Sequence, residues 1–254
     1  MHFARSALEQ PSSSNNAPFP LPALLGKTAR HVHLYALRYD AREFVLSDFK
    51  DAGLACPPQI ERATRKRQAR YFHGRVCARQ ALIAANAPIL DVRVGLRREP
   101  VWPPGFIGSI SHSSSFAAVV VAAHPHAAGL GIDLGIVVPS APAIRLMEAA
   151  LSSDELDYLR SLAMPGHALL LTLAFCAKEA FLKAAFSELG RIFSLDAVRI
   201  VQIDVSRQRV RVELRMTLSA LLQRGSRHEV RFAMLDAVTL CTVCVRRHGA
   251  LAMA

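Results

Sequence analysis

The longest uninterrupted apolar pattern along the chain lies in residues 168–189. Apolar side chains recur there at helical spacing, among them Phe175, Leu182 and Phe186, and no Pro or Gly breaks the run. This spacing places apolar side chains on one side of a helix, and a Gly directly after the last periodic residue, here Gly190, is typical of a helix C-terminus. The pattern therefore predicts one long helix over residues 168–189.

Two further stretches have helical patterns. Residues 61–86 combine a row of basic side chains with apolar ones on the other side, and Pro88 ends the stretch. Residues 151–162 start with an N-cap residue, Ser152, and early acidic residues, which suit a helix N-terminus. We therefore expect a basic amphipathic helix early in the chain and a short helix before the long one.

Strands are predicted where apolar and polar residues alternate, or where β-branched residues dominate. These segments are residues 31–37, 116–123, 129–138, 197–205, 210–216, 229–235 and 238–245. The last four follow the long helix in sequence. We expect them to form an antiparallel sheet that packs on that helix.

This order of elements predicts an α+β fold with two similar α/β lobes, because each half offers a basic or amphipathic helix followed by strands. Residues 1–28, rich in Pro and Ser, are expected to form a flexible N-terminal arm. The two lobes are then residues 29–127 and residues 128–254.

The 254 residues carry 31 Lys and Arg against 20 Asp and Glu, a formal net charge of +11. This excess favours anionic partners, which include nucleic acids, phosphorylated cofactors and acidic proteins. No apolar run is long and charge-free enough to span a bilayer, and the N-terminus lacks the pattern of a secretory signal. We expect a cytoplasmic protein in which the five cysteines are reduced thiols.

Three charged residues draw attention by their positions. Glu179 and Lys183 are one turn apart on the predicted helix 168–189, so their side chains share a face. Alone, this would be an ordinary surface ion pair. Asp133 lies in the apolar strand 129–138, where a buried carboxylate needs a hydrogen-bond donor or a metal ion. An Asp that accepts hydrogen bonds from turn amides is the alternative.

Ser111 and His112 are adjacent at the mouth of strand 116–123, among small residues that let a ligand approach the backbone. A serine hydrolase would use such side chains as nucleophile and base. Neighbours in sequence rarely have that geometry, and the chain has no G-x-S-x-G nucleophile elbow. A serine hydrolase is therefore disfavoured.

Five short stretches together resemble one family. They are GRVCAR at 74–79, REPVWP at 98–103, GSISHS at 108–113, GID at 131–133 and FCAKEAFLK at 175–183. In this order they resemble the 4′-phosphopantetheinyl transferases, in particular the branch of enterobactin synthase component D-like enzymes. The resemblance covers about residues 60–200, and the combination is far more specific than any single stretch.

The resemblance implies transfer of the phosphopantetheine arm of coenzyme A to a serine of an acyl, aryl or peptidyl carrier protein. It implies two lobes related by a pseudo-twofold axis, with coenzyme A and Mg²⁺ in the cleft between them. Asp133 and Glu179 would hold the Mg²⁺, since carboxylate oxygens are the ligands that this ion prefers. Glu179 would also accept the serine proton, and Lys183 would hold a phosphate oxygen as charge shifts to the leaving group.

Other residues match positions that contact coenzyme A in this family. Arg67 and Arg75 match arginines at the phosphates or the adenosine end, and Arg97 and Arg98 lie in the strip beside the adenine and 3′-phosphate. Phe193 matches a position near the pantetheine arm. The full set of expected cofactor contacts is Arg67, Arg75, Arg97, Arg98, Ser111, His112, Asp133, Glu179, Lys183 and Phe193.

One position departs from the family pattern. The metal motif commonly has a second carboxylate two residues after the Asp, and here that residue is Gly135. Either the Mg²⁺ shell is completed by waters, which this ion tolerates well, or by another side chain, or the chain is a weakened homologue that binds only coenzyme A or a carrier. A basic nucleic-acid-binding protein is the alternative from another class, but it leaves Asp133 and Glu179 without a role.

The expected partners follow from the same resemblance. Carrier proteins are typically acidic, so the basic surface would speed their encounter with this chain. Siderophore assembly is the expected pathway, with other nonribosomal peptide, polyketide or fatty-acid carriers as alternatives. No nucleic acid is expected as a partner, and two lobes in one chain make a monomer sufficient.

Overall fold

The computed structural model describes residues 18–25, 31–137, 140–162 and 166–248. The helices are α1 (Pro22–Leu25), α2 (Asp48–Asp51), α3 (Pro58–Glu61), α4 (Arg65–Ala84), α5 (Ala141–Ala149), α6 (Ser153–Ser161) and α7 (His167–Leu189). The strands are β1 (Phe19–Pro20), β2 (Val32–Arg38), β3 (Arg93–Val94), β4 (Pro100–Val101), β5 (Phe106–His112), β6 (Phe116–Ala123), β7 (Gly129–Ile136), β8 (Val198–Asp204), β9 (Arg209–Leu214), β10 (Arg227–Met234) and β11 (Thr239–Arg246). Short 3-10 helices span His124–His126 and Leu195–Ala197.

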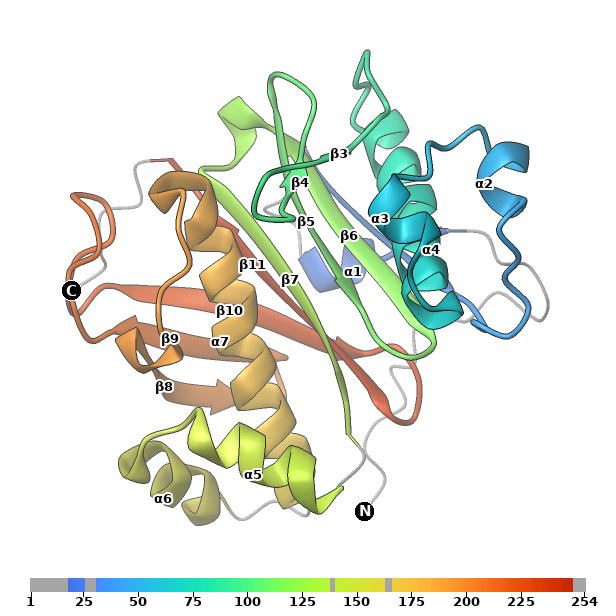
Figure 1. Ribbon diagram of the computed structural model, residues 1–254. Helices are drawn as coiled ribbons and strands as arrows, with labels where there is room; N and C mark the ends of the chain where they lie inside the picture. Colours follow the sequence, from blue (N-terminus) through green and yellow to red (C-terminus); the bar gives the residue numbers. More distant parts are fainter. Residues whose placement is uncertain (1–17, 26–30, 138–139, 163–165, 249–254) are drawn as a thin grey trace.

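The fold is α+β and contains two sheet-bearing halves (Figure 1). The first sheet has the strand order β1-β2-β6-β5, and the second has the order β7-β11-β10-β9-β8; all their neighbouring strands are antiparallel. The strands β3 and β4 pair as a separate hairpin. Within the described residues, no helix is long and apolar enough to cross a membrane.

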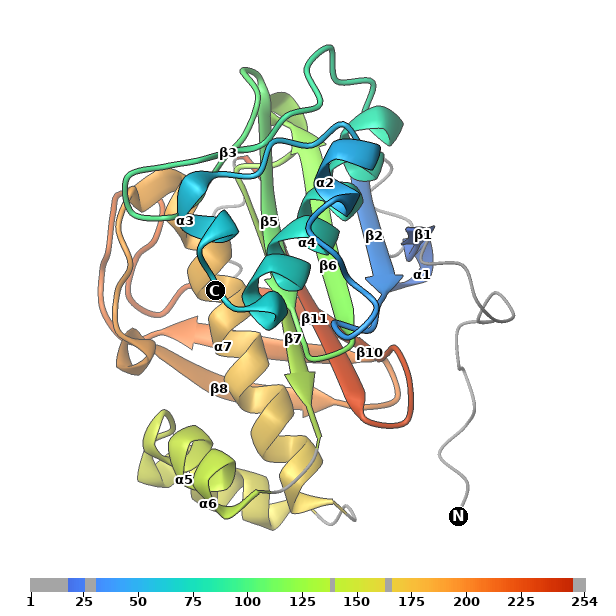
Figure 2. The ribbon, with the colours of Figure 1, turned by 45° about the vertical axis from the view of Figure 1, so that its right-hand side comes forward.

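In the described part of the chain, three apolar cores separate four layers. The first core lies between α4 and the first sheet, the second between the two sheets, and the third between α7 and the second sheet. The strand β6 therefore has covered faces on both sides, which explains its continuous apolar sequence FAAVVVAA. Figure 2 shows α4 lying over β5 and β6.

The strands β8 and β9, and β10 as far as Arg231, have one covered face, whereas Ala233 near the end of β10 packs in the core between the two sheets. Val198, Val210, Val212 and Val230 are buried and belong to the core beneath α7. The residues between them in sequence are mostly arginine and acidic residues, as expected from the period-two alternation of a half-buried strand. These three strands therefore present a charged face on the side of the sheet away from α7.

The helix α7 packs very closely on β7. A Cβ atom at Gly131 would overlap the carbonyl oxygen of Ala180, so only glycine fits at this position. Asp133 follows Gly131 by two residues and so shares its face of the strand. The close approach of α7 therefore brings the carboxylate of Asp133 directly against the helix.

A buried ion pair fixes α6 against α7 and β8. Glu155 is 3% exposed, and its carboxylate accepts hydrogen bonds from Lys178 Nζ at 2.8 Å and from the Ile200 amide at 2.7 Å. The same carboxylate caps α6 through the Ser152 amide at 2.9 Å. Figures 1 and 2 show α6 and α5 side by side near the N-terminal end of α7.

Most elements predicted from the sequence are confirmed. The long helix over 168–189 is α7, and the four predicted strands after it form an antiparallel sheet on which α7 packs. The helix predicted over 61–86 is shorter, because α4 begins at Arg65, after the separate turn of α3.

One prediction about the first sheet is wrong. Ser111 and His112 were expected at the mouth of a strand, but both lie within β5, which spans Phe106–His112. Its small and polar residues resemble a loop, yet Ser109 and Ser111 are buried and alternate with Ile110 and His112. A strand is stable here because the second sheet supplies donors for these hydroxyl groups.

The predicted N-terminal arm is described only in part. Residues 18–25 form β1, which pairs with β2, and α1, in which Leu24 and Leu25 are buried. Residues 1–17 and 26–28 lie outside the described residues. The division into an arm and two lobes stays a prediction.

Candidate active site

The two sheets meet where β5 and β7 run side by side, and two serines of β5 join them. Ser109 Oγ accepts a hydrogen bond of 3.2 Å from the Ile132 amide, and Ser111 Oγ accepts one of 3.1 Å from the Leu134 amide. These amides lie on β7, the edge strand of the second sheet, which pairs with β11 on one side and with no strand of the described residues on the other. The serines therefore satisfy backbone donors that would otherwise be buried without partners.

Asp133 lies between these two amides in β7. Its Oδ1 accepts a hydrogen bond of 2.9 Å from Ser111 Oγ and one of 2.6 Å from Lys183 Nζ. The Asp133 side chain is 13% exposed. The donors that a buried carboxylate needs are thus supplied by β5 and α7, and not by turn amides.

Lys183 is held from two sides. Besides Asp133, its ammonium donates a hydrogen bond of 3.0 Å to the Ile132 carbonyl. An ammonium group has three hydrogens, so one hydrogen remains that no described residue accepts. With 29% of its side chain exposed, Lys183 keeps access to solvent or to a ligand.

Glu179 lies one helical turn before Lys183. Burial raises the pKa of its carboxyl above the usual value, the negative charge of Asp133 raises it further, and the charge of Lys183 acts in the opposite direction. Two carboxylates that repel each other in a partly buried place are a suitable environment for a cation.

The described residues contain no group of three or more His, Cys, Asp and Glu side chains able to hold a metal ion. Asp133 and Glu179 therefore form a two-carboxylate site at most. Such a pair fits Mg²⁺, which commonly uses one or two carboxylates and completes its six ligands with waters and substrate phosphates.

His112 faces α4 from β5. A Cβ atom at Gly74 of α4 would lie 2.7 Å from His112 Nε2, so the glycine makes room for the imidazole. Burial lowers the pKa of His112 to about 3, with further lowering from the charges of Lys183, Arg70, Arg75 and His73. His112 is therefore neutral at pH 7 and lies among positive charges.

Two arginines of α4 supply part of this positive charge. The Nε atoms of Arg70 and Arg75 are both buried, and neither has a hydrogen-bond partner in the described structure. The guanidinium of Arg75 lies 4.4 Å from the centre of the Tyr71 ring, which fixes its orientation. Cationic groups with unused donors around a neutral histidine can bind an anion such as a phosphate.

Arg70 is absent from the sequence-based candidates. It lies one turn before Gly74 and therefore on the same helix face, which is the signal that could have identified it. Ser109 was missed for a similar reason. It shares a strand face with Ser111, but that face is evident only once β5 is recognised as a strand.

The remaining candidates lie in other surroundings. Arg97 Nη1 donates a hydrogen bond of 2.9 Å to the carbonyl of Gly190, so the β3–β4 hairpin reaches the C-terminal end of α7. Arg98, in the same loop, and Arg67, in the first turn of α4, are exposed. Phe193 is 8% exposed and packs edge-on against Phe181 in the core beneath α7.

Side chains of α7 fill the space beside Gly135. A Cβ atom at this position would lie 2.5 Å from both Cys176 Sγ and Thr172 Cγ2 of α7. A third carboxylate beside Asp133 would therefore require these two α7 side chains to shift. Cys176 does not substitute for it, because burial and the charge of Asp133 raise the pKa of this thiol and keep it neutral.

Comparison with known protein families gives two adjoining matches. Residues 57–122 match the family model of the 4′-phosphopantetheinyl transferase N-terminal domain. Residues 129–243 match the model of the 4′-phosphopantetheinyl transferase superfamily. The first match contains α4, β5 and most of β6, and the second contains β7 and α7, so both halves of the site are included.

Individual relatives agree with these matches. The chain is 32% identical to enterobactin synthase component D of Salmonella typhi over 191 residues, which are 74% of each protein. It is 33% identical to the 4′-phosphopantetheinyl transferase Npt of Nocardia iowensis, over 49% of this chain and 54% of the relative. The transferase PptT of Mycobacterium tuberculosis is 33% identical, over 51% of this chain and 56% of the relative. The chain therefore belongs to the 4′-phosphopantetheinyl transferase superfamily of enzymes, whose donor substrate is coenzyme A.

Proposed function

We propose that this protein transfers the 4′-phosphopantetheine group of coenzyme A to a serine hydroxyl of an apo carrier protein. The observation that supports this most is the cluster at the β5–β7 junction. There, Asp133, Glu179 and Lys183 lie on one side, and His112 is surrounded by the charges of α4 and α7. Acidic and basic groups are thus both available where a pyrophosphate and a metal ion would meet.

The proposed reaction is a phosphoryl transfer. The serine oxygen forms a bond to the phosphorus that carries the pantetheine arm, and the bond from this phosphorus to the bridging pyrophosphate oxygen breaks. The adenosine part leaves with both of its phosphates, and the serine proton passes to Glu179, directly or through a water molecule. A carboxyl with a raised pKa is a better proton acceptor at neutral pH than an ordinary one.

Lys183 is proposed to bind a phosphate oxygen with its third ammonium hydrogen. The other two hydrogens fix the ammonium on Asp133 and on the Ile132 carbonyl, so its position is set before the substrate arrives. A preorganised cation stabilises the charge that develops during transfer at little reorganisation cost.

The coenzyme A phosphates are proposed to bind on the α4 side. Arg70 and Arg75 have buried Nε atoms without hydrogen-bond partners, and neutral His112 has one ring N–H to donate. Ser111 is also proposed to contact the cofactor. Its hydroxyl would have to do so while it donates a hydrogen bond to Asp133. Arg67, Arg97 and Arg98 would bind the adenosine end, which the exposure of all three permits.

Mg²⁺ is proposed as the metal ion, held by Asp133 and Glu179. When bound, it would neutralise the pyrophosphate oxygens and orient the phosphorus for attack. The active site would be a cleft between residues 29–127 and residues 128–254, with the two lobes related by a pseudo-twofold axis. In support, α4 and α7 lie on either side of the β5–β7 junction (Figure 1).

The acceptor is proposed to be an acidic carrier of a siderophore pathway, with other nonribosomal peptide or polyketide carriers as further substrates. The support is the similarity to proteins named enterobactin synthase component D, together with the net charge of +11. Measuring kcat/KM over a panel of apo carriers tests this choice. A clear preference for fatty-acid carriers would contradict it.

The activity itself is tested by mass spectrometry. An apo carrier is incubated with this protein, coenzyme A and Mg²⁺, and the mass of the carrier is measured with and without EDTA. The expected result is the gain of one phosphopantetheine group, which EDTA prevents. No gain with any carrier, together with intact coenzyme A binding by calorimetry, would contradict the proposal.

A second candidate has a specific observation in its favour. The space for another carboxylate at Gly135 is filled by Cys176 and Thr172, so the metal site is limited to two carboxylates. A weakened homologue would bind coenzyme A or a carrier without efficient transfer. Titrating Mg²⁺ in the mass assay separates the two, because a weak metal site shows activity only at high Mg²⁺ concentration.

A further inference from the structure

The open face of the second sheet carries a regular grid of charged residues. Backbone pairing aligns the outward residues of β8, β9 and β10 in three rows. The rows are Arg199, Glu213 and Arg227; Gln202, Arg211 and Glu229; and Asp204, Arg209 and Arg231. We call these nine residues the arginine face; five of them are arginines and three are acidic.

The acidic residues of the arginine face orient the guanidinium groups without using all their donors. Glu213 pairs with both Arg199 and Arg227, and Glu229 pairs with both Arg209 and Arg231 at 3.1 Å. A guanidinium has five N–H donors, so each arginine retains donors for another acceptor. The side chains of Arg199, Arg209 and Arg227 are 45%, 40% and 55% exposed, so these donors are accessible.

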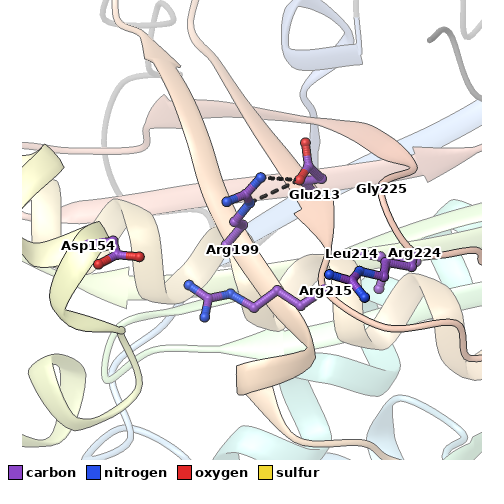
Figure 3. A pocket seen from close by; sticks show the side chains of 7 residues that line it. All are labelled: Asp154, Arg199, Glu213, Leu214, Arg215, Arg224 and Gly225. Atoms are coloured by element: carbon purple, nitrogen blue, oxygen red, sulfur yellow. Dashed lines mark hydrogen bonds and ion pairs between the residues drawn. The ribbon is translucent and has the colours of Figure 1, made fainter.

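Two cavities open along the arginine face. The larger has a volume of about 320 Å³ and is lined by Arg199, Glu213, Arg215 and Arg224, with Asp154 at the end opposite Arg224 (Figure 3). The smaller, about 110 Å³, is lined by residues of the other two rows and by Arg207. Both cavities add arginines to the five of the grid, so the positive charge extends beyond the strands.

Two arginines at these cavities are weakly paired within the described structure. Arg211 donates to the uncharged Gln202 at 3.2 Å. The side chain of Arg224 is exposed and has no ion-pair partner among the described residues. Unneutralised guanidinium groups favour an anionic ligand with two acceptor oxygens, such as a carboxylate or a phosphate.

The arginine face is separate from the candidate active site. Val210, Val212 and Val230 point to α7 from the same strands, so the grid lies on the opposite side of the sheet. Asp133 instead faces α7 and bonds with Lys183 of that helix. A ligand on the arginine face would therefore not compete with coenzyme A.

The composition of the face favours an acidic polypeptide over a nucleic acid. None of the nine residues is aromatic, so the face offers no platform on which bases would stack. Its three acidic residues would repel a continuous phosphate backbone. Separate carboxylates on flexible side chains can instead bind the arginines and avoid the acidic residues.

We propose that the arginine face is a docking surface for an Asp- and Glu-rich segment of a partner protein. Carboxylates of the segment would bind the free guanidinium donors of Arg211 and Arg224 and enter the two cavities. The inference needs only the charges and geometry of this face, so its failure would leave the proposed transfer reaction untouched.

The test uses fluorescence anisotropy with a labelled, unstructured peptide rich in Asp and Glu. The face variant replaces Arg211 of the arginine face, and Arg207 and Arg224 of the two cavities beside it, by Gln. A control variant replaces Arg62, Arg65 and Arg145, which are exposed elsewhere, by Gln. Both variants lose the same charge, and none of these residues belongs to the candidate active site. Thermal unfolding of each variant verifies that it is folded.

The expected result is a loss of peptide affinity of about tenfold in the face variant and at most about twofold in the control. Saturating coenzyme A should not displace the peptide. Equal losses in both variants would overturn the proposal, because net charge alone would then explain binding. It would also be overturned if a labelled oligothymidylate bound more tightly than the peptide and lost affinity only in the face variant.

Discussion

Lys183 of α7 and Asp133 of β7 form an ion pair of 2.6 Å between the helix and the strand that carry the candidate active site. Their side chains are 29% and 13% exposed, so the pair is only partly screened by water. The pair exists because glycine at position 131 lets α7 approach β7 closely. With the roles proposed for these two residues, the pair would contribute to both stability and activity, and the two contributions can be measured separately.

Replacing Lys183 by Met should destabilise the protein by about 1–3 kcal/mol, because Asp133 then keeps Ser111 as its remaining side-chain donor. The double variant with Asp133→Asn should recover most of this loss, since no unpaired charge remains. Urea unfolding of both variants measures the difference. Both variants should fail to modify a carrier. Recovery of activity in the double variant would contradict the proposed roles of Lys183 and Asp133 in the transfer reaction.

Replacing Glu179 by Gln should reduce kcat/KM by at least about 100-fold, because the proposed metal-ligand charge and the proposed proton acceptor are lost together. The free energy of unfolding at pH 7 should not fall. Burial and Asp133 raise the pKa of Glu179, so its ionised form is disfavoured in the folded protein, and a neutral amide removes that cost. A variant with nearly normal turnover would show that Glu179 has another role.

The elements that the sequence predicts well are those whose pattern is local. In α7, apolar spacing and Gly190 lie within one stretch, and the period of two in β9 and β10 is visible without any partner. Asp133 could also be identified, because a lone carboxylate in an apolar strand needs a partner wherever the chain folds.

The features that the sequence did not predict depend on contacts between distant residues. In β5, Ser109 and Ser111 are stable in a buried strand because they accept hydrogen bonds from β7, more than twenty residues later. At position 135, the sequence alone shows only that a glycine replaces the carboxylate common in the family. Its crowding by Cys176 and Thr172 is a property of the packed helix, which no local pattern contains.

The two serines of β5 should respond differently to mutation. Ser109→Ala leaves the Ile132 amide without its acceptor and should cost about 1–3 kcal/mol of stability, with little change in kcat. Ser111→Ala should cost a similar amount through the Leu134 amide, and should also lower activity because Asp133 loses a donor. Equal kcat values for the two variants would show that Ser111 acts only in the fold.

Introducing a carboxylate at position 135 should not create a better metal site. Gly135→Glu places a Cβ atom 2.5 Å from Cys176 Sγ and Thr172 Cγ2, so these side chains, or α7 with them, must shift. We expect a loss of about 1–3 kcal/mol or more, typical of overpacking, and lower activity. Combining it with Thr172→Ala and Cys176→Ala should recover part of the stability. A stable and more active single variant would disprove this account of the site.

A partly buried histidine should make the stability of the second half sensitive to acid. His228 of β10 lies 4.7 Å from the ring of Phe181, and its Nε2 is 3.2 Å from Ser226 Oγ. Burial lowers the pKa of His228 to about 4, with further lowering by the charge of Arg246 and an opposite effect of Glu188. The folded state therefore resists protonation of this imidazole.

The sign of the effect follows from proton binding. As pH falls below about 6.5, the unfolded chain binds a proton at His228 while the folded protein does not, so stability decreases until the pH nears 4. The full difference corresponds to about 3 kcal/mol. Urea unfolding from pH 7 to about 4.5 should show a smaller loss in His228→Gln than in the unmodified protein. The matched variant of the exposed His167, His167→Gln, should retain the original acid sensitivity, and if His228→Gln also retains it, His228 is not the residue responsible.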